Sequence, residues 1–228
     1  MTSILKADTI QDAAGNNIIN ENANTITIGA SGDTINVPSG ATFNVQGTAG
    51  TGFDGRWALI STGTIPGGAT YIDMDDVFSA TYKNYLLVTT GIDVNTDGAD
   101  LHIQVKTSGG LVSGGSDYLY SYLQRASNTD SHSGSYSTGA SYFRLNSSGV
   151  GNAAEESANL FIQFYNVRST SHYKLIFSQM TSLSTGSDAL YNLAIGAVKT
   201  TTALTGLRLK TASGNLDAGV LKLYGAND

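Results

Sequence analysis

The 228-residue chain contains no cysteine and only two prolines. Without cysteine, a disulfide framework, a thiolate zinc site and a cysteine nucleophile are all excluded. Cations are also scarce, because 12 Lys and Arg stand against 18 Asp and Glu, which gives a net charge of −6 and a pI near 4.9. Proteins that bind nucleic acid or anionic membranes present a basic surface. We therefore expect neither of these partners.

Long hydrophobic runs are also missing. No segment approaches the roughly 20 apolar residues of a membrane-spanning helix. The first ten residues carry Lys6 and Asp8 where a signal peptide would need an apolar core. We expect a soluble protein that is neither inserted into a membrane nor exported through a signal peptide.

The residues that are abundant indicate β-structure. Hydrophobic residues make up 40 % of the chain, enough for a sizeable core, whereas charged residues make up 13 % and Gly numbers 27. This balance is typical of many short strands joined by tight turns and argues against a helical protein. We predict an all-β fold.

A regularly spaced pattern occupies Thr25–Val45, which reads TITIGASGDTINVPSGATFNV. Pairs of apolar residues, each pair separated by one polar residue, alternate with turn residues. This is the period-2 pattern of short strands with one buried face. The pairs are Ile26 with Ile28, Ile35 with Val37, and Phe43 with Val45.

Strands this short cannot bury their own hydrophobic face. A monomer would leave a row of open strand edges in water. We therefore predict that three identical chains wind together into a triangular β-prism stalk, with these six side chains meeting at the three-fold axis. An ordinary pair of hairpins in a monomer is the alternative.

The chain divides into three predicted regions. Residues 1–24 form an attachment segment, in which the turn residues Ala14–Asn17 indicate a hairpin. Residues 25–50 form the stalk, and residues 51–228 form a head domain. The glycine-rich stretch 46–55 supplies a short flexible neck between stalk and head.

The head contains longer strand patterns that recur every 10 to 20 residues, with Gly, Ser or Asn between them. This spacing is typical of an antiparallel β-sandwich, with a jelly roll as the leading form. Short helical turns are expected at Asp75–Ala80 and Ala153–Ala158. The predicted strands are Trp57–Thr62, Ala69–Asp73, Asn84–Ile92, Asp100–Thr107, Asp117–Arg125, Ala140–Leu145, Asn159–Val167, His172–Met180, Ala189–Lys199, Ala203–Lys210 and Gly219–Tyr224.

Several stretches resemble one class of viral protein. Ser3–Phe43 resembles the N-terminal module of tail-fibre and adhesion proteins of marine bacteriophages, on both its sequence and its period. Trp57–Asp76 and Thr81–Val105 resemble the start of the globular domain of such proteins, and Leu216–Gly225 resembles their closing strand. Residues 108–200 carry no such resemblance.

The resemblance implies a trimeric fibre on the virion tail that acts outside the cell. Its N-terminus would attach to phage tail or baseplate proteins, and its head would contact a glycan or protein on the host surface. A capsid head fibre or decoration protein is an alternative with the same fold. A glycan depolymerase of the tail-spike type is an alternative from another class.

Receptor contacts are predicted within Tyr118–Tyr142, which is rich in Tyr, Ser, Gly and Asn. Antibody loops use this mixture for adaptable binding. The first three tyrosines alternate, so they share one face of a strand, which is either covered by the other sheet or open to sugar rings. The Ala126–Gly139 loop is either a binding loop or a simple mobile connection. The predicted receptor-binding residues are Tyr118, Tyr120, Tyr122, Asn128, Asp130, His132, Tyr136 and Tyr142.

One string resembles half of a calcium-binding loop. Asp93–Gly98, DVNTDG, places oxygen ligands at alternate positions before a glycine, as the first half of an EF-hand loop does. Position 12 of that loop falls on Gln104, which cannot supply the bidentate carboxylate. The Asp-Gly turn of a hairpin between the flanking strands explains the same residues without a cation.

Catalytic patterns are weak. Glycosidases use two carboxylates about 5 to 9 Å apart, and the candidates are Glu155–Glu156 or Asp73 with Asp76. Adjacent residues do not provide that geometry by themselves. No Gly-x-Ser-x-Gly elbow or phosphate-binding glycine loop is present. We expect no enzymatic activity, no metal and no cofactor. The histidines are His102 and His172 in predicted strands and His132 in a polar loop.

Overall fold

All the regular secondary structure that the computed structural model describes is β-strand. The structure describes residues 57–129 and 132–226, together with residues 9–11, 13, 17–22, 25–28, 32, 34 and 36. The chain divides into two units, Met1–Gly50 and Thr51–Asp228. No helix among the described residues is long and apolar enough to span a membrane.

The N-terminal unit contains a three-stranded antiparallel sheet in the order β1-β2-β3. Its strands are β1 (Thr9–Gln11), β2 (Asn17–Asn22) and β3 (Thr25–Ile28). β1 and β2 pair across the stretch in which Ala14–Asn17 predicted a turn, so the expected hairpin is present. β3 pairs with β2, with Ile28 opposite Ile19. The sheet therefore includes residues on both sides of the predicted boundary at residue 25.

The predicted stalk is described only in part. Ile26 and Ile28 lie in β3, whose backbone pairs with β2 of the same chain. Thr34 and Asn36 lie outside strands, which differs from the strand expected around Ile35. Ile35, Val37, Phe43 and Val45 lie outside the described residues, as does the 46–55 neck.

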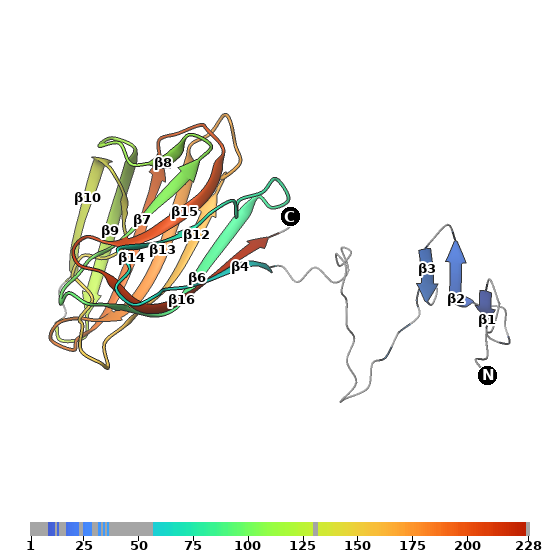
Figure 1. The fold of residues 1–228 in the computed structure, drawn as a ribbon, viewed down its shortest axis with the longest axis horizontal. Coiled ribbons are helices and arrows are strands. Elements are labelled where there is room, and N and C mark those ends of the chain that lie inside the picture. Colours follow the sequence, from blue (N-terminus) through green and yellow to red (C-terminus); the bar gives the residue numbers. More distant parts are fainter. Residues whose placement is uncertain are drawn as a thin grey trace. The chain divides into compact units, whose positions relative to one another are not determined.

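The head is built from two antiparallel sheets (Figure 1). The larger has eight strands in the order β10-β9-β14-β13-β12-β6-β16-β4, and the smaller has β11-β7-β15-β5 in order, with β8 also paired to β7. The large-sheet strands are β4 (Ala58–Thr64), β6 (Asn84–Val94), β9 (Tyr118–Ala126), β10 (His132–Ala140), β12 (Ala158–Tyr165), β13 (Lys174–Leu183), β14 (Ala189–Val198) and β16 (Leu216–Ala226). The small-sheet strands are β5 (Tyr71–Met74), β7 (Leu101–Thr107), β8 (Gly110–Val112), β11 (Phe143–Arg144) and β15 (Leu204–Thr211).

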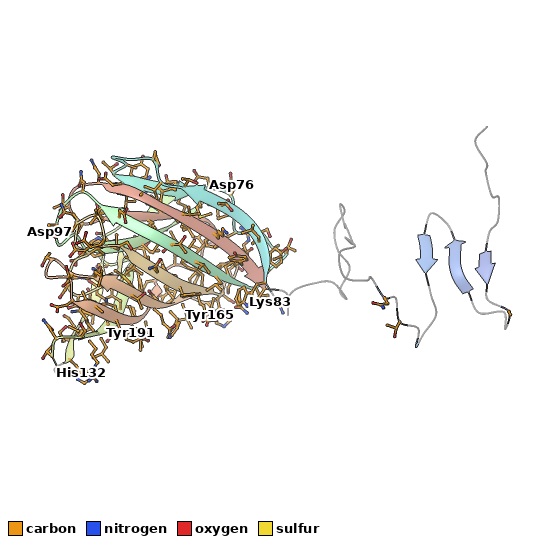
Figure 2. The ribbon with its side chains drawn as sticks, turned by 90° about the horizontal axis from the view of Figure 1, so that it is seen from below. Asp76, Lys83, Asp97, His132, Tyr165 and Tyr191 are labelled. Carbon is orange, nitrogen blue, oxygen red and sulfur yellow. The ribbon has the colours of Figure 1, made fainter. Side chains whose placement is uncertain are left out.

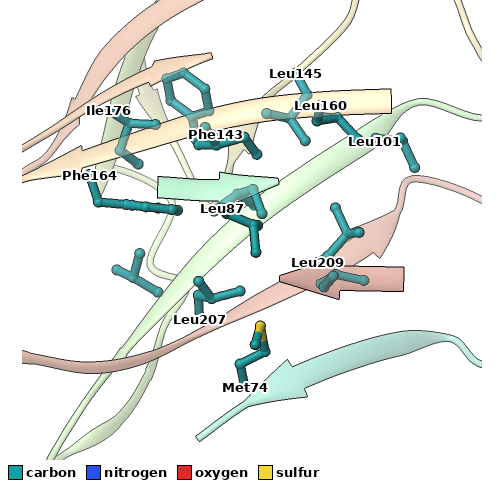
Figure 3. Close-up of a cluster of buried hydrophobic side chains, with 14 of the residues drawn as sticks. Met74, Leu87, Leu101, Phe143, Leu145, Leu160, Phe164, Ile176, Leu207 and Leu209 are labelled. Carbon is teal, nitrogen blue, oxygen red and sulfur yellow. The ribbon is translucent and has the colours of Figure 1, made fainter. Parts of the chain in front are cut away.

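One continuous hydrophobic core lies between the sheets (Figure 3). In β12, ANLFIQFY, alternate side chains are buried, and Leu160 and Ile162 of this strand are fully inaccessible to solvent. From the smaller sheet, Leu207 and Leu209 of β15 are equally buried. Strand alternation places every second residue on the inner face, so the two sheets form a β-sandwich. The head has more strands than the eight of a simple jelly roll.

The expected hairpin between β6 and β7 is wrong. β6 pairs with β12 and β16 in the large sheet, whereas β7 pairs with strands of the small sheet. Asp93 therefore lies at the end of β6, and Asn95–Gly98 lies in a connection that crosses from one sheet to the other. In it, the Gly98 amide donates a hydrogen bond to the carbonyl oxygen of Val150. A local turn pattern cannot distinguish these two outcomes, because both need a chain reversal.

Two further expectations also fail. His132–Gly139 was expected within the Ala126–Gly139 loop but belongs to β10, an edge strand that pairs along β9. Its sequence, HSGSYSTGA, has no apolar alternation, so only the neighbouring strand explains its conformation. The expected helical turns at Asp75–Ala80 and Ala153–Ala158 are absent from these described residues, which consist of irregular segments, bends and turns, with Ala158 as the first residue of β12.

A matched pair of substitutions tests which side chains of the large sheet point into the core. Leu160→Ala should lower the free energy of unfolding by about 2–5 kcal/mol, because it removes a buried side chain and leaves a cavity. Gln179→Ala changes an exposed residue of neighbouring β13, and its free energy of unfolding should stay within about 0.5 kcal/mol of that of the parent protein. Denaturant titration of both variants at one chain concentration measures the difference. Equal losses would contradict the assigned faces.

Candidate functional site

The three alternating tyrosines of β9 face the core. Tyr118 is 0 % exposed, Tyr122 is buried and Tyr120 is half-buried against the hydrophobic core. Of the two alternatives for this face, the structure therefore has the one in which the other sheet covers it. Tyr118 and Tyr122 were expected to contact a receptor, and their burial corrects that expectation.

Tyr118 connects the two sheets through its hydroxyl group. The hydroxyl donates a hydrogen bond to the carbonyl oxygen of Val112 and accepts one from the amide of Val105, both at 2.8 Å. These partners belong to β8 and β7 of the small sheet, whereas Tyr118 belongs to the large one. Burial raises the pKa of Tyr118, because the ionised phenolate would be poorly solvated there.

The other predicted receptor residues do not gather on one surface. Asn128 is exposed, and its amide donates to Asp188 Oδ2 at 2.6 Å. His132 and Tyr136 are exposed on β10. Tyr142 stacks on His102, with ring centroids 3.7 Å apart. Asp130 lies outside the described residues.

The outer side of the large sheet carries an unusual number of exposed apolar side chains. β9, β12, β13, β14 and the edge strand β10 all contribute to this surface, which we call the apolar face. Figure 2 labels Tyr191 on it, and shows Tyr165 along the same side of the head. The residues of the apolar face are Leu119, Leu123, Tyr136, Phe161, Leu175, Tyr191 and Ile195.

Strand register places these side chains side by side. In one row, Tyr136 of β10 lies opposite Ser121, which lies opposite Ile195 of β14. In the next row, Leu119 pairs with Ala197, and Ala197 pairs with Leu175. Directly opposed residues of an antiparallel pair point to the same side of the sheet. The apolar face is therefore continuous across four strands.

A groove of about 600 Å³ runs across the apolar face. Its apolar lining includes the residues Leu119, Tyr136, Tyr165, Leu175, Phe177 and Ile195. The lining also includes the hydroxyl-bearing residues Ser121, Ser137 and Thr138, whereas no charged residue lines it. A groove of this character can exclude water from an apolar partner surface, but it offers few directed hydrogen bonds.

Sequence reasoning identified the tyrosines of β9 and missed the leucines between them. The run YLYSYL is apolar at most positions of both faces, which is the pattern of a strand covered on both sides. This signal was available in the sequence. The tyrosines fill the core, and Leu119 and Leu123 form the outer surface.

Charged groups pair on the outer side of the small sheet. Asp73 Oδ1 and Oδ2 accept hydrogen bonds from Arg208 at 2.7 and 2.8 Å, and Lys106 Nζ lies 2.5 Å from Asp73 and 2.6 Å from Asp75. Burial opposes ionisation of Asp73, but these two cations outweigh it and lower the pKa of the carboxyl group. Asp73, one of the candidate glycosidase carboxylates, is thus paired with Arg208 and Lys106.

The Asp93–Gly98 string uses its polar side chains for structure. Asn95 Oδ1 accepts a hydrogen bond from the amide of Asn215 at 2.8 Å and one from the Thr96 hydroxyl at 3.1 Å. Burial and the nearby charge of Asp217 raise the pKa of Asp93. Within the described ranges, no group of three or more His, Asp or Glu side chains is arranged to hold a metal ion.

The adjacent Glu155 and Glu156 are not placed as a catalytic pair. Glu156 is buried and stabilises a turn, accepting hydrogen bonds from the Ala153 amide at 2.9 Å and from the Ser187 hydroxyl at 3.1 Å. Glu155 is exposed. His172 lies just before β13 rather than within a strand, and its Nδ1 lies within hydrogen-bond distance of the hydroxyl groups of Ser169 and Ser171.

His102 is a titratable group whose pKa the fold changes strongly. It lies in β7, is 4 % exposed and stacks under Tyr142. Burial is the main cause that lowers the pKa of His102 to about 3, and the positive charges of Lys210 and Arg144 add to it. His102 is therefore neutral in the folded protein near pH 7.

The fold and this surface define a β-sandwich protein with one apolar sheet face. Comparison of the chain with protein-family models, with curated proteins and with solved structures finds no match. The assignment of a function therefore depends on the chain's own residues.

Removing the Tyr118 hydroxyl tests its role as a link between the sheets. Tyr118→Phe should lower the free energy of unfolding by about 1–3 kcal/mol, because the buried Val105 amide and Val112 carbonyl lose their partner. Tyr136→Phe is the control, since Tyr136 is 75 % exposed, and should change stability by less than about 0.5 kcal/mol. Thermal or denaturant unfolding provides the comparison. An unchanged free energy of unfolding in Tyr118→Phe would contradict the role of this hydroxyl as a link between the sheets.

His102 predicts a pH dependence of stability. Its pKa falls from 6.5 in the unfolded chain to about 3 in the fold, so below pH 6.5 the unfolded state binds the additional proton. The stability contribution is complete above pH 6.5 and decreases as pH falls. Between pH 7 and 5 the free energy of unfolding should drop by about 2 kcal/mol. His102→Phe, which keeps a ring against Tyr142, should remove this slope, and an unchanged slope would refute the assignment.

Proposed function

We propose that the chain is a homotrimeric attachment protein of a bacteriophage, a tail-fibre or receptor-binding protein without enzymatic activity. Its N-terminal unit joins three copies as a β-prism stalk and attaches them to tail or baseplate proteins. Its jelly-roll-like head contacts a glycan or protein on the host surface. The protein is thus located on the virion tail and acts outside the cell.

The observation that carries the proposal is the apolar face. Seven large apolar side chains are exposed on one side of a single sheet. Soluble monomers seldom expose contiguous apolar patches of this kind, and larger patches mark interaction sites. A protein with such a surface is suited to assembly and binding.

Two further observations support an attachment role over catalysis. Of the candidate carboxylates Glu155 and Glu156, Glu156 stabilises a turn, where it accepts two hydrogen bonds. Asp73 and Asp75 are paired with Lys106. The resemblance of Ser3–Phe43 to fibre modules directs the proposal to a virion rather than to another kind of assembly.

Trimer formation also matches what a weak binder needs. Three heads on one fibre, and several fibres on one virion, multiply a weak single-site affinity by raising the effective concentration. The exposed residues of the head outside the apolar face, Asn128 among them, remain the proposed receptor contacts. No membrane or nucleic-acid partner is part of the proposal, in keeping with the net charge of −6.

The mass of the purified full-length chain tests the assembly. One chain has a mass of 23.7 kDa, so three chains give about 71 kDa. Multi-angle light scattering during size-exclusion chromatography should give the trimer mass at micromolar chain concentration. A measured mass near 24 kDa, that of a monomer, would contradict the proposed trimer.

Imaging of virions with an antibody against this chain tests the location. We expect label at the tail. Label on the capsid faces would contradict the tail-fibre assignment and favour the alternative of a capsid head fibre. Incubation of the purified protein with host envelope polysaccharide should release no reducing ends. Their accumulation would show the depolymerase activity instead.

A further inference from the structure

The apolar face offers enough surface for a stable interface. Its seven large side chains are about half exposed, so at roughly 200 Å² each they present on the order of 700 Å² of apolar surface. A standard protein interface buries about 800 Å² on each partner. The face therefore provides most of the area that one partner contributes to a specific complex.

The chemistry of this surface fits a protein partner better than a sugar. Carbohydrate sites combine apolar contacts with several polar groups that fix the orientation of the ligand. In the groove, the Tyr165 hydroxyl already donates a hydrogen bond to Gln163 Oε1. The lining has no charged or amide side chain, and its other polar side-chain groups are hydroxyls, those of Tyr120, Ser121, Tyr136, Ser137 and Thr138. An apolar protein surface would satisfy the groove, and a glycan would lose hydrogen bonds to water there.

The charge distribution favours a second copy of this chain. Each chain carries a net charge of −6, so two copies repel one another at most approaches. The outward positions of the described strands β9, β12, β13 and β14 hold no Asp or Glu, and their single cation, Arg125, lies near the end of β9. The centre of the face, around Ile195 and Leu175, is uncharged. Copies can therefore meet there without burying a carboxylate, which would be costly.

We propose that the apolar face is the contact surface between copies of the head in the trimer. This inference rests on the proposed function, because the N-terminal unit would hold three heads together at high effective concentration. Under that condition a modest apolar interface forms readily. Around a three-fold axis the apolar faces of all three heads can point towards the axis, where one side of each face contacts the other side of the next.

The proposal also determines where a receptor can bind. Surfaces that point into the trimer are closed to the host, so Tyr136 and the groove belong to the assembly. The outer side of the small sheet and the exposed loops remain available. Among these are the Asp73–Arg208 pair and the Tyr142 ring stacked on His102, which the receptor would meet from outside.

Single cysteines test the proposal cleanly, because the chain has none of its own. Ile195→Cys and Leu175→Cys place a thiol on the apolar face, where the parent residues are 55 % and 49 % exposed in a single chain. Ser213→Cys places a thiol in the exposed turn between β15 and β16 as the matched control. The rate of reaction with iodoacetamide is measured for each full-length variant, alongside its mass by light scattering.

We expect trimers in which both face thiols react about tenfold or more slowly than the control. If the protein is a trimer and either face thiol reacts at the control rate, the inference is overturned and the proposed function is unaffected. If the protein is a monomer, both this inference and the proposed trimeric function are overturned. Protected thiols in a monomer would show that another segment of the same chain covers the face. Circular dichroism of each variant establishes that it is folded.

Discussion

Burial of alternate strand residues between the two sheets is the constraint on which the rest of the head depends. Once Leu160 and Ile162 of β12 point inward, Phe161 must point outward, because successive side chains of a strand lie on opposite faces. The same rule sends Tyr118 into the core and Leu119 to the surface. The core therefore determines which residues form the apolar face.

Polar groups inside the head are used mainly to hold the sandwich together. The Tyr118 hydroxyl connects β9 to β7 and β8 across the interior. Arg144 of β11 pairs with Asp100 at 2.5 Å, directly before β7. Lys174 is buried at the start of β13, where its ammonium group donates to the carbonyl oxygens of Ser169 and His172. Satisfied in this way, these groups stabilise the fold and are not free for chemistry.

The two faces of the sandwich divide the work that we propose for it. The outer side of the small sheet is charged and aromatic, with Arg208 paired to Asp73 and stacked 3.5 Å from the Tyr71 ring centroid. The outer side of the large sheet is apolar and uncharged at its centre. Opposite surface chemistry on the two sheets is what an assembly needs if one side meets sister chains and the other meets a host.

The sequence alone determined the all-β class and most head strands, because runs such as LFIQFYNV carry a strong local period of two. It could not determine that β6 and β7 belong to different sheets, or that the polar HSGSYSTGA segment forms β10, because strand pairing is a long-range choice. Nor could it determine the buried side of YLYSYL, which is apolar on both faces. Only packing against the small sheet decided that the tyrosines point inward and the leucines outward, since burial depends on what lies opposite.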